Sequence, residues 1–342
     1  MHSRFSARLR PAALTALGAA FWFTLAASLL APSSLVAGDS AVQWELEQRS
    51  IEAARALASH PMLQGMREPD RQRHVEFLVG NTLFVLSHEV GHAAITEMGI
   101  PVIGREEDAA DIFATLLALE MSNAFADRQL ANVAMGWFFS DRRNRQQGIK
   151  TAFYDEHGID VQRAYNIVCL MVGSDPNKFS ALASETQMPE ERQDTCRGDY
   201  SNASWSWNKV LEAHRRPPDK PKASISVVYG PADGAYDLYA QVARKLQFLE
   251  SMAATLSDQY VWRAPFSLEL QTCHEPSARW DLFTRKIIIC YEIVAEFSEL
   301  YRTYGRGQAF SISSENDDDV GATPSAKAPD PPAEPRLTSD AR

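Results

Sequence analysis

Residues 71–98 read RQRHVEFLVGNTLFVLSHEVGHAAITEM and predict a long α-helix with almost no polar face. A helix that is apolar nearly all round is a buried one, and the turn Gly99-Ile100-Pro101 ends it.

The helix carries the motif His88-Glu89-Val90-Gly91-His92. At about 100° per residue, His92 lies about 40° round the helix from His88, and Glu89 within about 100° of both. The two imidazoles can therefore share one cation, and the Glu89 carboxylate can reach a water bound to it. The alternative is a buried helix whose polar residues form a structural network.

Residues 104–111, GREEDAAD, open a second predicted helix, which starts near Arg105 and runs through Ala126. Glu107 and Asp111 lie one turn apart on one face of it. A catalytic zinc takes three protein ligands and keeps an open position. We expect Glu107 to be the third ligand, with Glu106 as the nearest alternative, and Asp111 to accept the N–H of a ligand histidine. The alternative is that these acids only stabilise the helix dipole.

The rest of the chain predicts an α+β fold that is mostly helical. We expect a zincin-like pair of active-site helices and a small β element from the C-terminal region. A loop is expected at residues 216–221, where prolines cluster, and Trp280 is placed in a loop between two strands. The further predicted helices cover residues 41–60, 236–260 and 291–301, and the predicted strands cover residues 225–229, 266–273 and 286–290.

The two motifs together resemble the gluzincin peptidases whose third ligand lies in an E-x-x-A-D helix, here Glu107-x-x-Ala110-Asp111. The strings HEVGHAAI (88–95), IPVIGREEDAAD (100–111) and DEHGIDVQRAYNIVCLMVGSDP (155–176) are similar to a bacterial family of exported metallopeptidases of unknown function. The similarity covers residues 78–196. It implies zinc on His88, His92 and Glu107, with Glu89 as the general base.

One element departs from that family's order. A strand–Cys–Tyr–Glu element precedes the HExxH helix in the family, whereas the similar string KIIICYE lies here at residues 286–292, near the C-terminus. Either this region packs against the active-site helix in space, or it forms a separate domain. We expect the first, because zincin-type sites are flanked by a strand that receives an extended substrate.

Asp155 and His157 form a further candidate pair. His157 is a candidate catalytic residue that would hydrogen-bond a developing oxyanion. The alternative is a loop histidine near the start of a helix.

The N-terminus has the pattern of an export signal. Three arginines (Arg4, Arg8 and Arg10) precede the uncharged stretch 11–37, and cleavage is expected after Ala37 or Gly38. The alternative is an uncleaved anchor, because residues 12–31 are a run of ~20 residues that could just span a bilayer. Both readings carry the protein across the inner membrane, to the periplasm or to a membrane-anchored position facing it.

The four cysteines agree with export. We expect the disulfides Cys169–Cys196 and Cys273–Cys290, each closing a short segment in an oxidising compartment. A four-cysteine zinc site is the alternative, but the chain has no close C-x-x-C pair.

The net charge and the order of the predicted segments bear on the partners and the domain organisation. The net charge of −10 disfavours nucleic acid as a partner, because a phosphate-backbone binder needs a basic surface. The expected organisation is a signal peptide or anchor at 1–38, a zinc metallopeptidase domain at 39–306 (metal core 71–214, C-terminal region 222–306) and a disordered tail at 307–342.

The predicted function is hydrolysis of peptide bonds in peptide or protein substrates outside the cytoplasm, with Glu89 activating a zinc-bound water. The alternative is an inactive metal-binding or protein-interaction domain that keeps the fold. The presence of Glu89 argues against this alternative, because structural zinc needs no base.

Overall fold

The computed structural model describes residues 40–307, except residue 233. The predicted signal peptide or anchor lies outside the described residues, and so does the predicted tail beyond Gly307. No helix in the described part of the chain has both the length and the apolar character needed to cross a membrane.

The described chain is mostly helical with one small sheet, which confirms the predicted α+β class. The helices are α1 (Ser40–Ala56), α2 (Glu68–Met98), α3 (Glu106–Glu120), α4 (Ala124–Gln146), α5 (Asp160–Ser174), α6 (Pro176–Glu185), α7 (Glu190–Glu212), α8 (Asp237–Leu246), α9 (Phe248–Gln259) and α10 (Tyr291–Leu300), with a 3-10 turn η1 (Gly234–Tyr236) and a π-helical turn η2 (Tyr301–Gly305). The strands are β1 (Ile225–Tyr229), β2 (Phe266–Gln271), β3 (Ala278–Asp281) and β4 (Lys286–Cys290).

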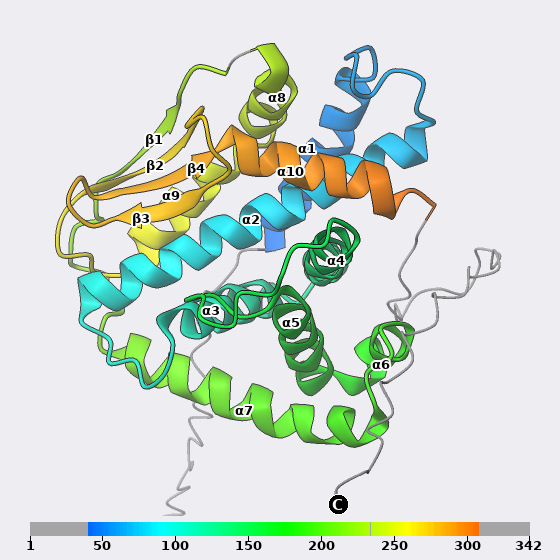
Figure 1. Cartoon of the computed structure of the whole chain (residues 1–342). Coiled ribbons are helices and arrows are strands. Elements are labelled where there is room, and N and C mark those ends of the chain that lie inside the picture. Colours follow the sequence, from blue (N-terminus) through cyan, green and yellow to red (C-terminus); the bar gives the residue numbers. More distant parts are fainter. Residues whose placement is uncertain (1–39, 233, 308–342) are drawn as a thin grey trace, which may run out of the picture. The chain divides into compact units, whose positions relative to one another are not determined.

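The helix α2 is the centre of the fold. It contacts α1, α3, α4, α10, β3 and β4, and it runs between the sheet on one side and α3, α4 and α5 on the other (Figure 1). Pro69 lies in its first turn, and Gly99 ends it with a left-handed φ of 64° and an N–H bonded to the Ile95 carbonyl. Most of its residues from 74 to 97 are buried, as the all-round apolar pattern predicts.

A close helix contact holds α3 against α2. A Cβ added to Gly91 would lie 3.1 Å from the Cα of Ala110, so a larger residue at position 91 would push the two helices apart. Gly91 stands between the two motif histidines, and Ala110 stands between Glu107 and Asp111. This contact therefore brings the acidic pair of α3 next to the histidines.

The sheet has the strand order β1-β2-β4-β3. β1 pairs in parallel with β2, and β2 in parallel with β4, with Leu268 opposite Ile287. β3 pairs antiparallel with β4 and forms one edge of the sheet. The C-terminal region thus packs against α2 through β3, β4 and α10.

Three sequence expectations about these elements were wrong. The helix predicted to run through Ala126 is two helices, because Asn123 caps α4 by accepting a hydrogen bond from the Ala126 N–H. The helix predicted over 236–260 breaks at Gln247, which takes a left-handed φ of 54°. Trp280 lies in the strand β3 and not in a loop. The segment between β2 and β4 forms this extra strand at the edge of the sheet before the chain enters β4, which pairs in parallel with β2.

The structure contains both predicted disulfides, Cys169–Cys196 and Cys273–Cys290. The first joins α5 to α7, and the second joins the segment after β2 to the end of β4. Replacing Cys169 and Cys196 together by alanine is expected to lower the free energy of unfolding by ~2–5 kcal/mol, because the unfolded chain loses a constraint. Urea denaturation of the oxidised proteins measures this difference. An unchanged midpoint and slope would contradict it.

A fully buried histidine on α2 is expected to make the free energy of unfolding depend on pH. His74 places its Nε2 3.0 Å from the Ser298 hydroxyl and stacks on the Tyr301 ring. Burial, and then the charges of Arg302 and Arg306, lower the pKa of His74 to about 4. An unfolded histidine has a pKa of ~6.5, so the unfolded chain binds this proton first as the pH falls.

Stability is therefore expected to fall between pH 6.5 and 4, by up to ~3 kcal/mol from His74 alone. Phenylalanine at this position keeps the stacking and does not titrate, so His74→Phe should lose less stability over this range than the wild type. Chemical denaturation at pH 7 and pH 4.5 measures the difference, with His60→Phe, at a half-buried position after α1, as the control. Equal losses in His74→Phe and the wild type would show that His74 is not responsible.

Candidate metal centre

Three nitrogen and oxygen atoms from α2 and α3 converge on one point. His88 Nε2 lies 3.1 Å from His92 Nε2 and 3.0 Å from a Glu107 carboxylate oxygen, which is 3.4 Å from His92 Nε2. His88 is buried, and His92 and Glu107 are half-buried. In the described part of the chain, these residues form a group that could hold a metal ion.

The donor spacing fits a small tetrahedral cation. Nitrogen and oxygen ligands at about 2.0–2.2 Å from zinc lie about 3.3–3.6 Å apart at the corners of a tetrahedron. The three separations in this site are close to that range. Burial would raise the pKa of Glu107, but hydrogen bonds from His157, His88 and His92 lower it far below its usual value. Glu107 is therefore ionised at neutral pH, as a metal ligand must be.

A chain of contacts orients His88. Its Nδ1 lies 2.8 Å from the Asp111 carboxylate, which accepts two hydrogen bonds of 2.7 Å from Arg163. The Arg163 guanidinium stacks over the Trp137 ring at 3.7 Å. Because Asp111 can only accept, it keeps a proton on Nδ1 and turns Nε2 toward Glu107. Burial disfavours the charged imidazole, but the hydrogen bonds to Asp111 and Glu107 raise the pKa of His88 to about 9.

His92 has its own carboxylate partner. Its Nδ1 lies 2.8 Å from a Glu106 oxygen, whereas Asp108 pairs with Arg105 instead. Sequence reasoning treated Glu106 as a helix-dipole residue or a substitute ligand and did not predict this contact. The only available signal was its position beside Glu107.

The Glu89 carboxylate links the motif helix α2 to the sheet. It is buried, and it accepts a hydrogen bond from the backbone N–H of Trp280 in β3. Burial raises the pKa of Glu89 despite the opposing effect of His88 and His92. The sequence did not predict this contact, because Trp280 lies 191 residues further along the chain.

The structure brings His157 to the same site. Its Nε2 lies 3.0 Å from Glu107, and its Nδ1 and backbone N–H contact Asp155 at 3.3 and 2.9 Å. His157 is half exposed and carried by the loop before α5. The sequence identified the pair with Asp155, but only the fold places it beside α3.

A cleft of about 530 Å³ opens beside these residues. Its lining includes His88, Glu89 and His157, and on the sheet side the segment Pro276-Ser277-Ala278. This volume falls within the ~300–1,000 Å³ of ligand-binding pockets in proteins.

A family model described as "Putative metallopeptidase" matches residues 38–211, which include α2, α3 and α5. The chain belongs to this family. No curated protein and no solved structure matches the chain. Membership implies a bound metal and peptide or protein substrates, and the cluster of His88, His92 and Glu107 could bind the metal.

Proposed function

We propose that this protein is a zinc-dependent, gluzincin-like metallopeptidase that hydrolyses peptide bonds. The observation that carries the proposal is the convergence of His88 Nε2, His92 Nε2 and a Glu107 oxygen within 3.0–3.4 Å of one another, with the buried carboxylate of Glu89 beside them. Two imidazoles and one carboxylate are a donor set typical of catalytic zinc. Bound there, zinc would lower the pKa of a water molecule and polarise the scissile carbonyl.

In this proposal Glu89 moves the proton. Its carboxylate takes a proton from the attacking water and returns it to the nitrogen of the leaving amine. Burial raises the pKa of Glu89, which brings the carboxylate closer to the range in which it can both accept and release a proton at neutral pH. The Trp280 N–H holds one of its oxygens in place.

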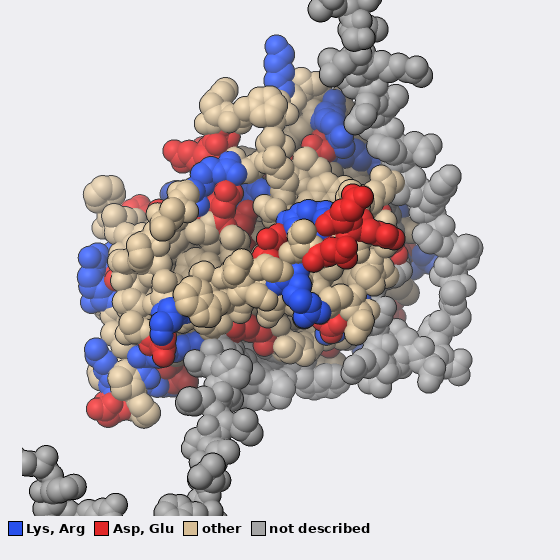
Figure 2. Space-filling model, turned by 90° about the horizontal axis from the view of Figure 1, so that it is seen from below, with Lys and Arg blue, Asp and Glu red and all other residues tan. Residues whose placement is uncertain are grey.

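Two neighbouring elements would position the substrate. His157 would donate from Nε2 to the oxyanion that develops on the scissile carbonyl. β3 is an edge strand, and the segment that leads into it lines the cleft, so an extended peptide would lie along this side. Nucleic acid is not part of the proposal, since basic and acidic side chains mix on the face shown in Figure 2 and the net charge is −10.

We also propose that the protein acts outside the cytoplasm, either free in the periplasm or anchored to the membrane and facing the periplasm. Two disulfides support this location, because such bonds persist in oxidising compartments. The apolar N-terminal stretch 11–37 supports it independently.

The test is metal content measured together with peptide turnover. Elemental analysis of the purified protein should find about one zinc per chain, and casein or a peptide library should be cleaved. Treatment with 1,10-phenanthroline should abolish cleavage, and added zinc should restore it. Full zinc occupancy without cleavage of any peptide would favour the non-catalytic alternative. Absence of zinc from protein prepared with zinc in the medium would contradict the metal assignment.

A further inference from the structure

The loop between α4 and α5 carries a turn at the rim of the cleft. The Asp155 N–H donates to the Ala152 carbonyl at 3.0 Å, so Phe153 and Tyr154 are the two central residues of a β-turn. Ala152 and Asp155 both line the cleft. Asp155 also accepts a hydrogen bond of 2.9 Å from the backbone N–H of His157, which holds the turn beside the candidate metal centre.

The two aromatic side chains of this turn contribute little to packing. Phe153 is 83% exposed and Tyr154 is 92% exposed. The central positions of turns are commonly taken by glycine, proline, asparagine, aspartate or serine, because these residues suit the backbone geometry. Two adjacent aromatic residues at these positions are explained neither by the turn nor by packing, so they indicate a contact with another molecule.

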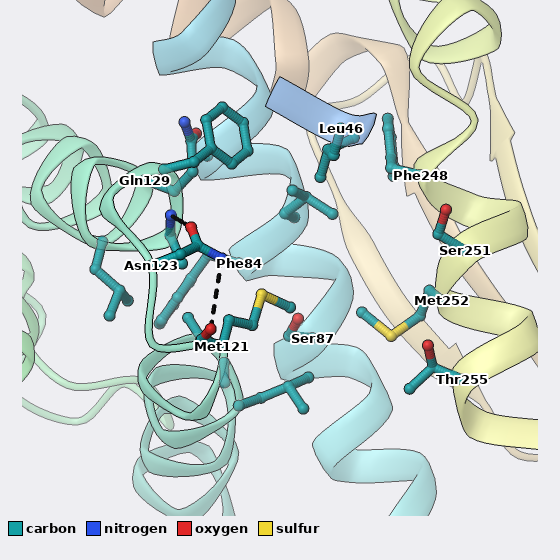
Figure 3. Close-up of a pocket in the computed structure, with 18 of the residues that line it drawn as sticks. Leu46, Phe84, Ser87, Met121, Asn123, Gln129, Phe248, Ser251, Met252 and Thr255 are labelled. Atoms are coloured by element: carbon teal, nitrogen blue, oxygen red, sulfur yellow. Dashed lines mark hydrogen bonds between the residues drawn. The ribbon is translucent and has the colours of Figure 1, made fainter. Parts of the chain in front are cut away.

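Aromatic side chains around α2 are buried, even beside a cavity. A cavity of about 340 Å³ lies on an adjacent face of this helix, and Phe84 and Phe248 in its walls are both buried (Figure 3). Phe84 also lines the cleft. The fold thus keeps the aromatic residues near the site away from water and leaves those of the turn at the surface.

The same loop continues the apolar lining of the cleft to its rim. Ile149 lines the cleft and is 55% exposed, and Trp137 and Ile293 add apolar surface further inside. A peptide that extends out of the cleft on this side would meet Phe153 and Tyr154 next, because both ends of their turn line the cleft. Contact with the two rings would remove apolar side chains of the peptide from water.

The charges around the turn disfavour an anionic lipid surface as the partner. Asp155 and Glu156 directly follow Tyr154, and both are exposed. Segments that bind anionic membranes carry clusters of lysine and arginine instead. A polypeptide with apolar side chains is therefore the partner that fits this turn.

We propose that Phe153 and Tyr154 bind apolar side chains of an extended polypeptide substrate at the rim of the cleft. The turn would thereby give the protein a preference for unfolded chains rich in apolar residues. This inference rests on the proposed peptidase function, because it takes the cleft to hold a peptide. The two can fail separately, since binding to the turn is measured on protein that does not cleave.

The probe is fluorescein-labelled α-lactalbumin that has been reduced and carboxymethylated, so that it stays unfolded. Its binding to zinc-loaded Glu89→Gln protein, the parent, is followed by fluorescence anisotropy. Adding Phe153→Ser and Tyr154→Ser should weaken binding about tenfold or more, because aromatic anchors commonly contribute at least this factor. Phe153→Tyr with Tyr154→Phe keeps both rings and should bind within about threefold of the parent.

The matched control removes an exposed aromatic side chain elsewhere. Trp205 on α7 is 69% exposed and does not line the cleft, so Trp205→Ser should bind the probe as the parent does. The melting temperature of the double serine variant should stay close to that of the parent, because both replaced side chains are exposed. In the chain with Glu89 intact, the two serines should raise KM and leave kcat within about threefold.

The proposal is overturned if the parent does not bind the probe, if the double serine variant binds it as tightly, or if Trp205→Ser weakens binding equally. Unchanged probe binding together with loss of a dimer in sedimentation velocity would assign the turn to a contact between two copies of the chain instead. Weaker binding in the double serine variant, with no cleavage by the wild type, would support the turn's role and refute only the peptidase function.

Discussion

Replacing Glu89 by glutamine is expected to slow peptide hydrolysis by about 10²–10⁴-fold, the usual contribution of general acid–base catalysis. Glutamine keeps the shape of the side chain but cannot take a proton from the attacking water. Zinc content and melting temperature should stay close to those of the wild type, because Glu89 is not one of the three converging donors. Steady-state kinetics on one peptide substrate, with elemental analysis of the same sample, measure both quantities.

The same substitution at Glu76 is a matched control. Glu76 is also buried on α2, but it contacts Gln72 and Arg128 and does not line the cleft beside His88 and Glu89. Glu76→Gln should therefore leave the turnover rate within about threefold of the wild type. Wild-type turnover in Glu89→Gln would show that Glu89 is not the base.

Replacing His92 by alanine is expected to remove the metal and all peptide hydrolysis that depends on it. Loss of an outer partner of a metal ligand typically costs about 10–100-fold in metal affinity, and loss of a ligand should cost more. We therefore expect His92→Ala to bind zinc at least ~100-fold more weakly than the wild type. Competition with a zinc-binding dye measures the affinity. His214→Ala, at a half-buried histidine outside the cluster, serves as the control.

Separate substitutions of Glu106 and Glu107 distinguish a metal ligand from a residue that only orients a ligand. Glu107→Gln should weaken zinc binding as strongly as His92→Ala does, because the Glu107 oxygen faces both histidines. Glu106→Gln should cost only about 10–100-fold, because Glu106 contacts the far nitrogen of His92. The reverse order of effects, or full zinc occupancy in His92→Ala, would refute the ligand assignment.

Local sequence determined the parts of the site that lie within one helix. The i, i+4 spacing of His88 and His92, and of Glu107 and Asp111, places each pair on one face as soon as the helix forms, whatever surrounds it. The ends of α2 were predictable to within three residues for a similar reason, since Pro69, Gly99 and Pro101 act through their own backbone geometry. The disulfide partners could be predicted because only three pairings of four cysteines exist.

Contacts between distant segments were decided by packing alone. Arg163 reaches Asp111 from α5, the Trp280 N–H reaches Glu89 from the sheet edge, and no periodicity connects these positions. The break at Gln247 was also decided by packing. Glutamine has no special preference for a left-handed φ, but Gln247 adopts one because the helices on both sides of it, α8 and α9, must bury their apolar faces.

The sequence by itself thus determined the chemical groups of the site, because the spacing of those groups is a property of a single helix turn. Their convergence was decided by tertiary structure, because it depends on how closely α3 approaches α2 at Gly91 and Ala110 and on which strand reaches the sheet edge beside Glu89. Helix periodicity acts over about four residues, whereas these contacts join segments that only a folded core holds together.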